Sequence, residues 1–373
     1  MALPIAAANG PDEGGRYIIP FELAGDEPVE RIGGKCIGLA ALVRAKAPVS
    51  PGFVITTDAF AEMMGVDGLG KEIATRLEGL DVENYENENR VSREIGEAIV
   101  RRDMPVAMEQ AIRAAYRRLA TEDHGDAAVA VRSSGTAEDL PDASFAGQGD
   151  TYLGIVGADE VVAKVKRCWA SLYSARAMSY RAQNSVEHLD VQMAVAVQVM
   201  VQAHSAGVAM TLDPANGDRS KIIIESTWGL GETLVSGEVT PDHFLVDKDM
   251  LIPVTRRIAE KDHELIVDPV TRHAVHRQVP EERRHLPSIR DDELKTIAQA
   301  AKTIERTFRC PQDIEWAIDE KRVESGGLVI LQSRPETVWS KRQAQTPKST
   351  VATTAAFSVL GSLIAPMAAK DNK

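Results

Sequence analysis

Four separated segments of the sequence combine residue types that are suited to holding phosphate groups. The first contains Gly33, Gly34 and Lys35 at the start of an expected helix. Glycines at that position let backbone N–H groups face an anion, and the lysine adds a positive charge. The spacing is not that of a P-loop, so on its own this segment also fits a turn followed by a solvated lysine.

The second segment places Arg132 at the end of an apolar strand. An arginine there is costly unless it meets an anion or a carboxylate. Arg132 therefore either binds an anion or pairs internally with Glu138 or Asp139. The loop Gly147-Gln148-Gly149 follows closely, and such a loop either folds its N–H groups over a polyphosphate or makes a plain hairpin turn.

The third segment, residues 225–243, is rich in glycine, which indicates unusual backbone angles or a close approach to another group.

The fourth segment contains Asp313 and Glu315, and then Gln332 and Arg334. In a strand, residues two apart share one face. If the two strands pair, a carboxylate, an amide oxygen and a guanidinium converge, and these oxygens suit Mg²⁺. A surface strand pair with one salt bridge is the alternative.

Hydrophobic periodicity predicts mixed helices and strands around these segments. A polar loop is expected near residues 84–89, and the chain is otherwise mostly helical from 58 to 120. The expected helices are residues 30–46, 160–183 and 286–308. The expected strands are residues 49–55, 127–132, 193–201, 221–225 and 328–331. This order indicates two lobes with a boundary near residue 190.

The composition limits the classes of function. Of 373 residues, 26% are charged, and the net charge of −12 gives no global attraction to nucleic acid. Three distant cysteines indicate neither a disulfide framework nor a zinc site, and they favour a reducing, cytoplasmic location. No secretory signal is expected, because no basic residue precedes the apolar N-terminus. The uncharged residues 351–369 predict a helix that packs on the body or on a partner, rather than a membrane anchor.

Taken in this order, the segments resemble the ATP-binding domain shared by phosphoenolpyruvate synthase, pyruvate phosphate dikinase and rifampin phosphotransferase, a divergent ATP-grasp fold. The resemblance covers residues 30–340. The matching stretches are Gly33-Gly-Lys35, Val131-Arg-Ser-Ser134, Ser144-Phe-Ala-Gly147, Cys168-Trp-Ala-Ser171, Val197-Gln-Val-Met200, Trp228-Gly-Leu-Gly231, Asp313-Ile-Glu-Trp316 and Leu331-Gln-Ser-Arg-Pro335. One departure is the stretch of residues 319–327, which is longer than the usual hairpin and leaves the register of the two strands open.

The resemblance implies an α+β, two-lobed ATP-grasp fold that binds ATP and Mg²⁺. It implies an N-terminal lobe over residues 1–190, a C-terminal lobe over 191–340, and a linker with an uncharged tail over 341–373. Lys35 and Arg132 would hold phosphates, and Arg334 would neutralise the transferred group. The remaining implied sites are a loop over the triphosphate (Gly147, Gln148, Gly149, Thr151), an adenine hinge (Gln198, Val199, Met200) and metal ligands (Glu315, Gln332).

The resemblance also implies a reaction with a partner. Longer family members carry a phosphate-accepting histidine in a Thr-Ser-His sequence, and none of the eight histidines here has that setting. We therefore expect a split dikinase-type phosphotransferase that forms AMP and phosphate and transfers a phosphoryl group to a histidine-bearing partner subunit. The chain is similar in size to the ATP-binding subunit of phenylphosphate synthase, and this resemblance implies phenol as the acceptor. The alternatives are a split phosphoenolpyruvate synthase with a pyruvate-like acceptor, an antibiotic (rifampin-type) phosphotransferase, and a non-catalytic ATP sensor.

Overall fold

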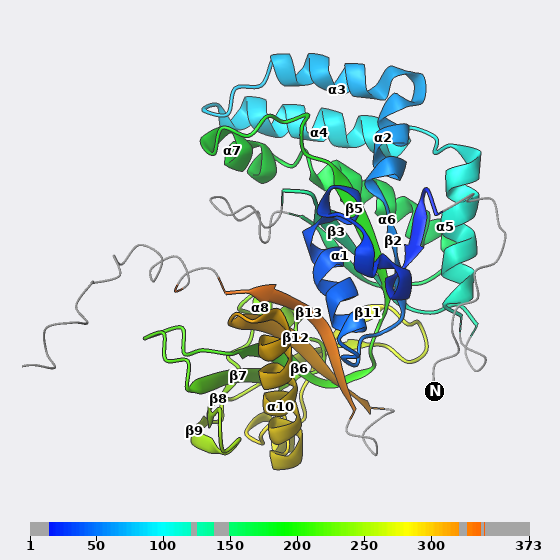
Figure 1. Ribbon diagram of the computed structural model, residues 1–373. Coiled ribbons are helices and arrows are strands. Elements are labelled where there is room, and N and C mark those ends of the chain that lie inside the picture. Colours follow the sequence, from blue (N-terminus) through cyan, green and yellow to red (C-terminus); the bar gives the residue numbers. More distant parts are fainter. Residues whose placement is uncertain (1–14, 121–124, 138–148, 321–326, 337–338, 340–373) are drawn as a thin grey trace, which may run out of the picture. The chain divides into compact units, whose positions relative to one another are not determined.

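The computed structural model describes residues 15–120, 125–137, 149–320, 327–336 and 339 (Figure 1). Residues up to Pro335 belong to one compact unit. The unit contains helices and two large antiparallel sheets, which confirms the predicted α+β class. The tail at residues 351–369 lies outside the described residues, so its predicted helix stays a prediction.

The first sheet has five strands in the order β1-β2-β5-β3-β4. Their bounds are β1 (Ile18–Pro20), β2 (Gly52–Ile55), β5 (Met193–Val199), β3 (Val129–Gly135) and β4 (Thr151–Ile155). The central strand β5 is apolar except for Gln198, because both of its faces are covered. Val195 and Val197 face the main helical core, whereas Ala194 and Ala196 face helix α1. These small alanine side chains let α1 pack closely on the sheet.

Helices surround this sheet. Their bounds are α1 (Val29–Arg44), α2 (Thr57–Gly65), α3 (Leu69–Glu78), α4 (Tyr85–Arg101), α5 (Val106–Arg118), α6 (Ala158–Ser171) and α7 (Ala175–Gln183), with short 3-10 helices η1 (Phe21–Asp26) and η2 (Val66–Gly68). The prediction of a polar loop near residues 84–89 is wrong. Asn84 is instead the N-cap of α4, and its side chain accepts a hydrogen bond from the Asn87 N–H at 3.0 Å. The single helix predicted over residues 160–183 is two helices, because Ser174 caps a new start at Ala175.

The second sheet has six strands in the order β13-β12-β6-β7-β8-β9. Their bounds are β6 (Ala203–Met210), β7 (Lys221–Trp228), β8 (Asp242–Asp247), β9 (Pro253–Arg257), β12 (Gln312–Asp319) and β13 (Leu328–Pro335). Helix α10 (Asp291–Phe308) covers one face and buries Trp316 completely. The hairpin β10 (His263–Val267) and β11 (Ala274–Gln278), together with the short helices α8 (Glu232–Val235) and α9 (Glu281–Arg284), completes this part.

The chain passes from the first sheet to the second between Val199 and Ala203, because β5 pairs with β2 and β3 whereas β6 pairs with β7 and β12. The division into lobes near residue 190 stays a prediction, and β5 lies on the first-sheet side of this passage.

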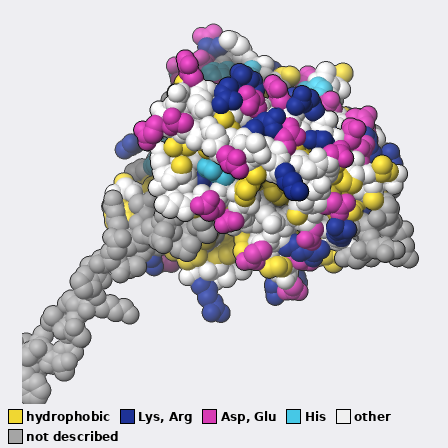
Figure 2. Space-filling view, turned by 90° about the horizontal axis from the view of Figure 1, so that it is seen from above, with side chains coloured by type: hydrophobic (Ala, Val, Ile, Leu, Met, Phe, Trp, Pro, Cys, Tyr) yellow, Lys and Arg dark blue, Asp and Glu magenta, His cyan; other side chains and the backbone are white. Residues whose placement is uncertain are grey.

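The surface seen in Figure 2 carries acidic and basic side chains interspersed, without a field of one sign. Among the described residues, no helix combines the length and the apolar character needed to cross a bilayer.

Helix α1 is kinked where it approaches the first sheet. Gly33 has φ of 71° and ψ of 168°, which breaks the helix between Ile32 and Gly34. The Ser134 hydroxyl spans the break, because it accepts from the Cys36 N–H at 3.2 Å and donates to the Ile32 carbonyl at 3.0 Å. A side chain at Gly33 would place its Cβ 2.2 Å from the Ser134 carbonyl oxygen. The kink therefore requires glycine at this position.

The variant Gly33→Ala should lower the free energy of unfolding by about 3 kcal/mol, because it combines a left-handed backbone with steric overlap. Chemical denaturation measures this change. Gly65→Ala is the matched control, since Gly65 has nothing within 4 Å of an added Cβ and should change stability little. Equal effects of the two substitutions would contradict a specific requirement at Gly33.

Candidate functional site

A cavity of about 670 Å³ lies between the facing sides of the two sheets. The first sheet contributes residues of β3, β4 and β5, and the second contributes residues of β6, β12 and β13. Lys35 of α1 and the segment around Glu232 also line the cavity. Its size is within the range of cavities that take small-molecule ligands and cofactors. Ten of the twelve residues predicted for the site lie along it.

Arg132 is the main link across the cavity. From β3 its guanidinium donates to the Glu315 carboxylate at 2.9 Å and to the Gln332 side-chain oxygen at 3.2 Å. It also donates to the Leu331 carbonyl at 3.2 Å. Arg132 therefore meets a carboxylate, as the sequence required, but that carboxylate comes from 183 residues further along the chain. The predicted alternatives Glu138 and Asp139 lie outside the described residues.

The electrostatic environment keeps Glu315 ionised. Burial alone would raise the pKa of this carboxyl, but the charge of Arg132 and its hydrogen bond lower the pKa. The positive charges of Arg334 and Lys35 act in the same direction, and the net result is a pKa below the ordinary value. A carboxylate that stays charged in the cavity is suited to bind a cation.

Lys35 is positioned by the helix kink. Its side chain is almost fully buried, and its ammonium donates to the Ser133 carbonyl at 2.7 Å. Because Ser134 fixes the kink and Ser133 receives the ammonium, one short stretch of β3 sets both the helix and its lysine. Lys35 thus lies on the same cavity wall as Arg132.

The oxygen donors on β12 and β13 fit a magnesium ion. Glu315 and Gln332 are directly opposite each other across the two strands, and both reach the same nitrogen of Arg132. Asp313 lines the cavity from the same side of β12. No group of three or more histidine, cysteine, aspartate or glutamate ligands occurs among the described residues. Mg²⁺ usually binds through one or two carboxylates, with phosphates and water completing its shell, and Glu315 and Gln332 fit this pattern.

Apolar side chains form another part of the cavity lining. Ala130, Leu153, Val199, Met200 and Val201 line it. Gln198 is also there, and its buried side-chain nitrogen has no hydrogen-bond partner among the described residues. An apolar slot with one unsatisfied donor suits a flat heterocycle with an acceptor atom.

The backbone of the predicted hinge is partly used within the protein. The Met200 N–H donates to the Ala128 carbonyl at 2.9 Å. That N–H is therefore engaged, whereas the Gln198 side-chain amide is available.

The predicted glycine loop is only partly described. Gly147 and Gln148 lie outside the described residues, whereas Gly149 and Thr151 line the cavity. A Cβ at Gly149 would lie 2.0 Å from the Ser133 hydroxyl oxygen. Glycine at this position therefore lets the loop return close against β3.

Arg334 also lines the cavity and lies directly opposite Asp313 in the strand pair. The long stretch at residues 319–327 left this register open in the sequence. The observed register brings Glu315 opposite Gln332, and Asp313 opposite Arg334, so all four side chains share one face.

Three acidic residues that line the cavity, Asp150, Glu232 and Asp313, were not assigned roles from the sequence. Asp313 could have been included, because it is two residues from Glu315. Glu232 follows the glycine pair Gly229 and Gly231 at the start of α8. Desolvation raises the pKa of the Glu232 carboxyl, and the charge of Glu315 raises it further. The glycine density was the signal for this segment, but it does not identify which side chain faces the cavity.

The sequence matches a known family over residues 29–355, and that family is described as the pyruvate phosphate dikinase AMP/ATP-binding domain. A phosphoenolpyruvate synthase of Aeropyrum pernix is 40% identical over 355 residues, which cover 88% of this chain and 43% of that protein. A probable phosphoenolpyruvate synthase of Methanothermobacter thermautotrophicus is 40% identical over 332 residues, covering 89% of this chain and 47% of that protein. The chain thus spans less than half the length of these relatives. The family match agrees with the predicted ATP-grasp-type fold.

The variant Arg132→Met should raise the pKa of Glu315, because it removes the strongest influences that lower it. In the wild type, the lowered pKa contributes stability above the ordinary value of 4.5, and this contribution is lost as the pH falls through the lowered value. The difference in unfolding free energy between wild type and variant should therefore shrink below about pH 4.5. Urea unfolding from pH 7 to pH 3 measures it.

The control for this titration is Arg101→Met, which removes an exposed arginine whose partner among the described residues is a backbone carbonyl of its own helix. The free energy of unfolding of this variant should differ from that of the wild type by the same amount at every pH in this range. If the difference in unfolding free energy between Arg132→Met and the wild type did not change with pH, the assigned ionisation of Glu315 would be contradicted.

Proposed function

Because the chain belongs to the pyruvate phosphate dikinase AMP/ATP-binding domain family, we propose that it binds ATP with Mg²⁺ in the cavity and acts as the ATP-binding part of a dikinase-type phosphotransferase. The observation that carries this proposal is the convergence of Arg132, Glu315 and Gln332 from two sheets. Phosphoryl transfer depends mainly on positioning and on neutralising charge. A cavity lined by cationic groups and oxygen ligands, and in part by apolar side chains, meets both needs.

In this proposal each end of the cavity takes one part of the nucleotide. The adenine ring occupies the apolar slot, with the Gln198 side-chain amide as a donor and Val199 and Met200 beside it. Gly147 to Gly149 and Thr151 cover the triphosphate. Mg²⁺ is held by Glu315 and Gln332, with Asp313 nearby, and when bound it neutralises phosphate oxygens.

Lys35, Arg132 and Arg334 contact the phosphates. Arg132 exchanges its internal carboxylate and amide partners for phosphate oxygens when the nucleotide binds, so its charge is never left unpaired. Arg334 stabilises the negative charge that develops on the transferred group.

We propose that the phosphoryl group passes to a histidine outside this sequence, on a partner subunit or on a further part of the same protein. The overall reaction converts ATP, water and an acceptor into AMP, phosphate and the phosphorylated acceptor. The names of the relatives support a pyruvate-like acceptor. Phenol, which was inferred from chain size, has no further supporting observation and takes second place. The three free cysteines support a cytoplasmic location.

The decisive experiment combines the purified chain with the histidine-bearing part of a related phosphoenolpyruvate synthase and measures AMP formation from ATP with Mg²⁺. The variant Arg334→Ala should reduce the rate by about 100-fold to 1,000-fold, the usual effect of removing a group that stabilises transition-state charge. ATP binding by calorimetry should change much less than the rate.

The surface variant Arg118→Ala should leave AMP formation unchanged. Failure of the wild-type chain to bind ATP would reject the proposed function. Unchanged AMP formation by Arg334→Ala would reject the role of that arginine. Complete phosphorylation of a small acceptor by the chain alone would reject the external histidine.

A further inference from the structure

We propose that Gln312 and Ser333 form a positioning clamp that sets the geometry of the metal- and phosphate-facing side chains of β12 and β13. The meaning of this clamp for catalysis rests on the proposed function, whereas its effect on the strands does not. Neither residue faces the cavity. Both lie on the opposite side of the sheet, toward helix α10, and both are buried.

The strand that needs positioning is β13, which is at the edge of the six-stranded sheet and pairs only with β12 inside it. On its cavity side it carries Gln332 and Arg334. Strand β12 is held on its other side by β6 in an unbroken register from Asp313 to Ile318. The position of Gln332 relative to Glu315 therefore depends on how β13 is fixed to β12.

A bulge interrupts that strand pair inside the site. Glu315 is opposite Gln332, but the next residue Trp316 is opposite Ile330, so Leu331 is an extra residue. The Leu331 carbonyl accepts a hydrogen bond from Arg132 at 3.2 Å. A bulge loosens the ladder and re-aims neighbouring side chains. Register on one side of the bulge is consequently not transmitted rigidly to the other.

The two halves of β13 have separate anchors. The far half is held at Ile330, whose N–H donates to the Pro48 carbonyl at 2.7 Å. The site half is held at Ser333, whose hydroxyl donates to the Gln312 side-chain oxygen at 2.7 Å. Ser333 lies between Gln332 and Arg334, and neighbouring side chains in a strand point to opposite faces. Fixing Ser333 on the helix side therefore fixes both of its neighbours on the cavity side.

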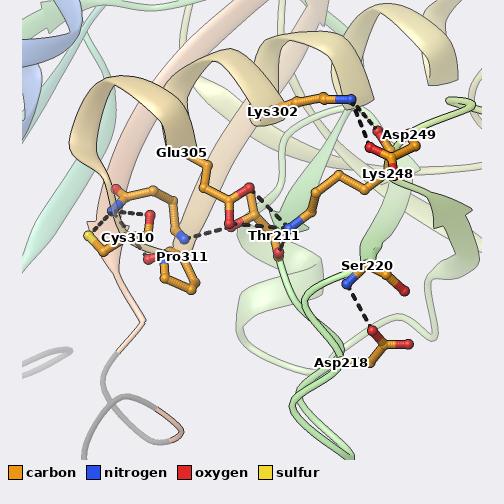
Figure 3. A network of polar contacts seen from close by, with 10 residues as sticks. Thr211, Asp218, Ser220, Lys248, Asp249, Lys302, Glu305, Cys310 and Pro311 are labelled. Carbon is orange, nitrogen blue, oxygen red and sulfur yellow. Dashed lines mark hydrogen bonds and ion pairs between the residues drawn. The ribbon is translucent and has the colours of Figure 1, made fainter.

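Gln312 is itself held firmly enough to act as an anchor. Its side-chain nitrogen donates to the Cys310 sulfur at 3.0 Å, to the Cys310 carbonyl at 3.3 Å and to the Pro311 carbonyl at 3.2 Å. Its backbone N–H donates to the Thr211 hydroxyl at 2.8 Å. The close view in Figure 3 shows Thr211, Cys310 and Pro311 around the start of β12, beside the Lys248 and Glu305 pair. These contacts set the orientation of the Gln312 side-chain amide independently of Ser333.

Hydrogen exchange tests the clamp without any assumption about function. In Ser333→Ala, the amides of residues 332–334 should exchange about fivefold faster or more, because one buried hydrogen bond is lost. Residues 328–330, on the other side of the bulge, should not change. Ser226→Ala is the matched control, since it removes another buried serine hydroxyl bond of 2.7 Å on the same face of the sheet. Equal changes on both sides of the bulge, or none, would overturn the clamp.

A second measurement tests positioning. ATP affinity is measured with and without Mg²⁺. Ser333→Ala should reduce the gain in affinity from Mg²⁺ by about tenfold while the metal-free affinity is unchanged, because only the oxygen geometry is disturbed. Ser333→Thr keeps the hydroxyl and should restore the gain, and Ser226→Ala should keep it. Faster exchange with an undiminished Mg²⁺ effect would overturn the positioning role. If the wild-type chain bound no ATP, the proposed function would fail, and hydrogen exchange would still decide on the clamp.

Discussion

The contact between Arg132 and Glu315 is the constraint on which the site depends. Arg132 belongs to the first sheet and Glu315 to the second, and the two charges meet at 2.9 Å inside the cavity. A guanidinium and a carboxylate form strong, directional hydrogen bonds in such surroundings. The contact keeps the Glu315 carboxylate ionised beside a cationic group, as the proposed magnesium-nucleotide site requires.

The other features of the site follow from holding these two residues in place. The kink at Gly33 and the Ser134 hydroxyl bring Lys35 to the same strand as Arg132. On the facing sheet, the Leu331 bulge turns a carbonyl toward the guanidinium and leaves Gln332 beside Glu315. Each arrangement places a polar group in the wall of the cavity.

Much of the fold was readable from the sequence, because its signals were local or strongly periodic. The apolar run of β5 and the shared face of Asp313 and Glu315 were both found this way. The polar stretch at residues 84–89 was misread because the first turn of α4 is polar and Asn84 caps it. The helix predicted over residues 160–183 was misread because apolar periodicity continues past Ser174. The partner of Arg132 was not readable, since it depends on a pairing between distant strands, and the bulge at Leu331 has no local signal.

The order of strands in the first sheet has a consequence for synthesis. β5 lies between β2 and β3, although it is the last of the five strands to leave the ribosome. Until residue 199 has emerged, β2 and β3 have no common neighbour, and the strand edges that later pair with β5 stay unpaired. Contacts between such distant residues form slowly, and exposed apolar strands aggregate. The strand edges of this sheet are therefore open to wrong pairing in a nascent chain until β5 is in place.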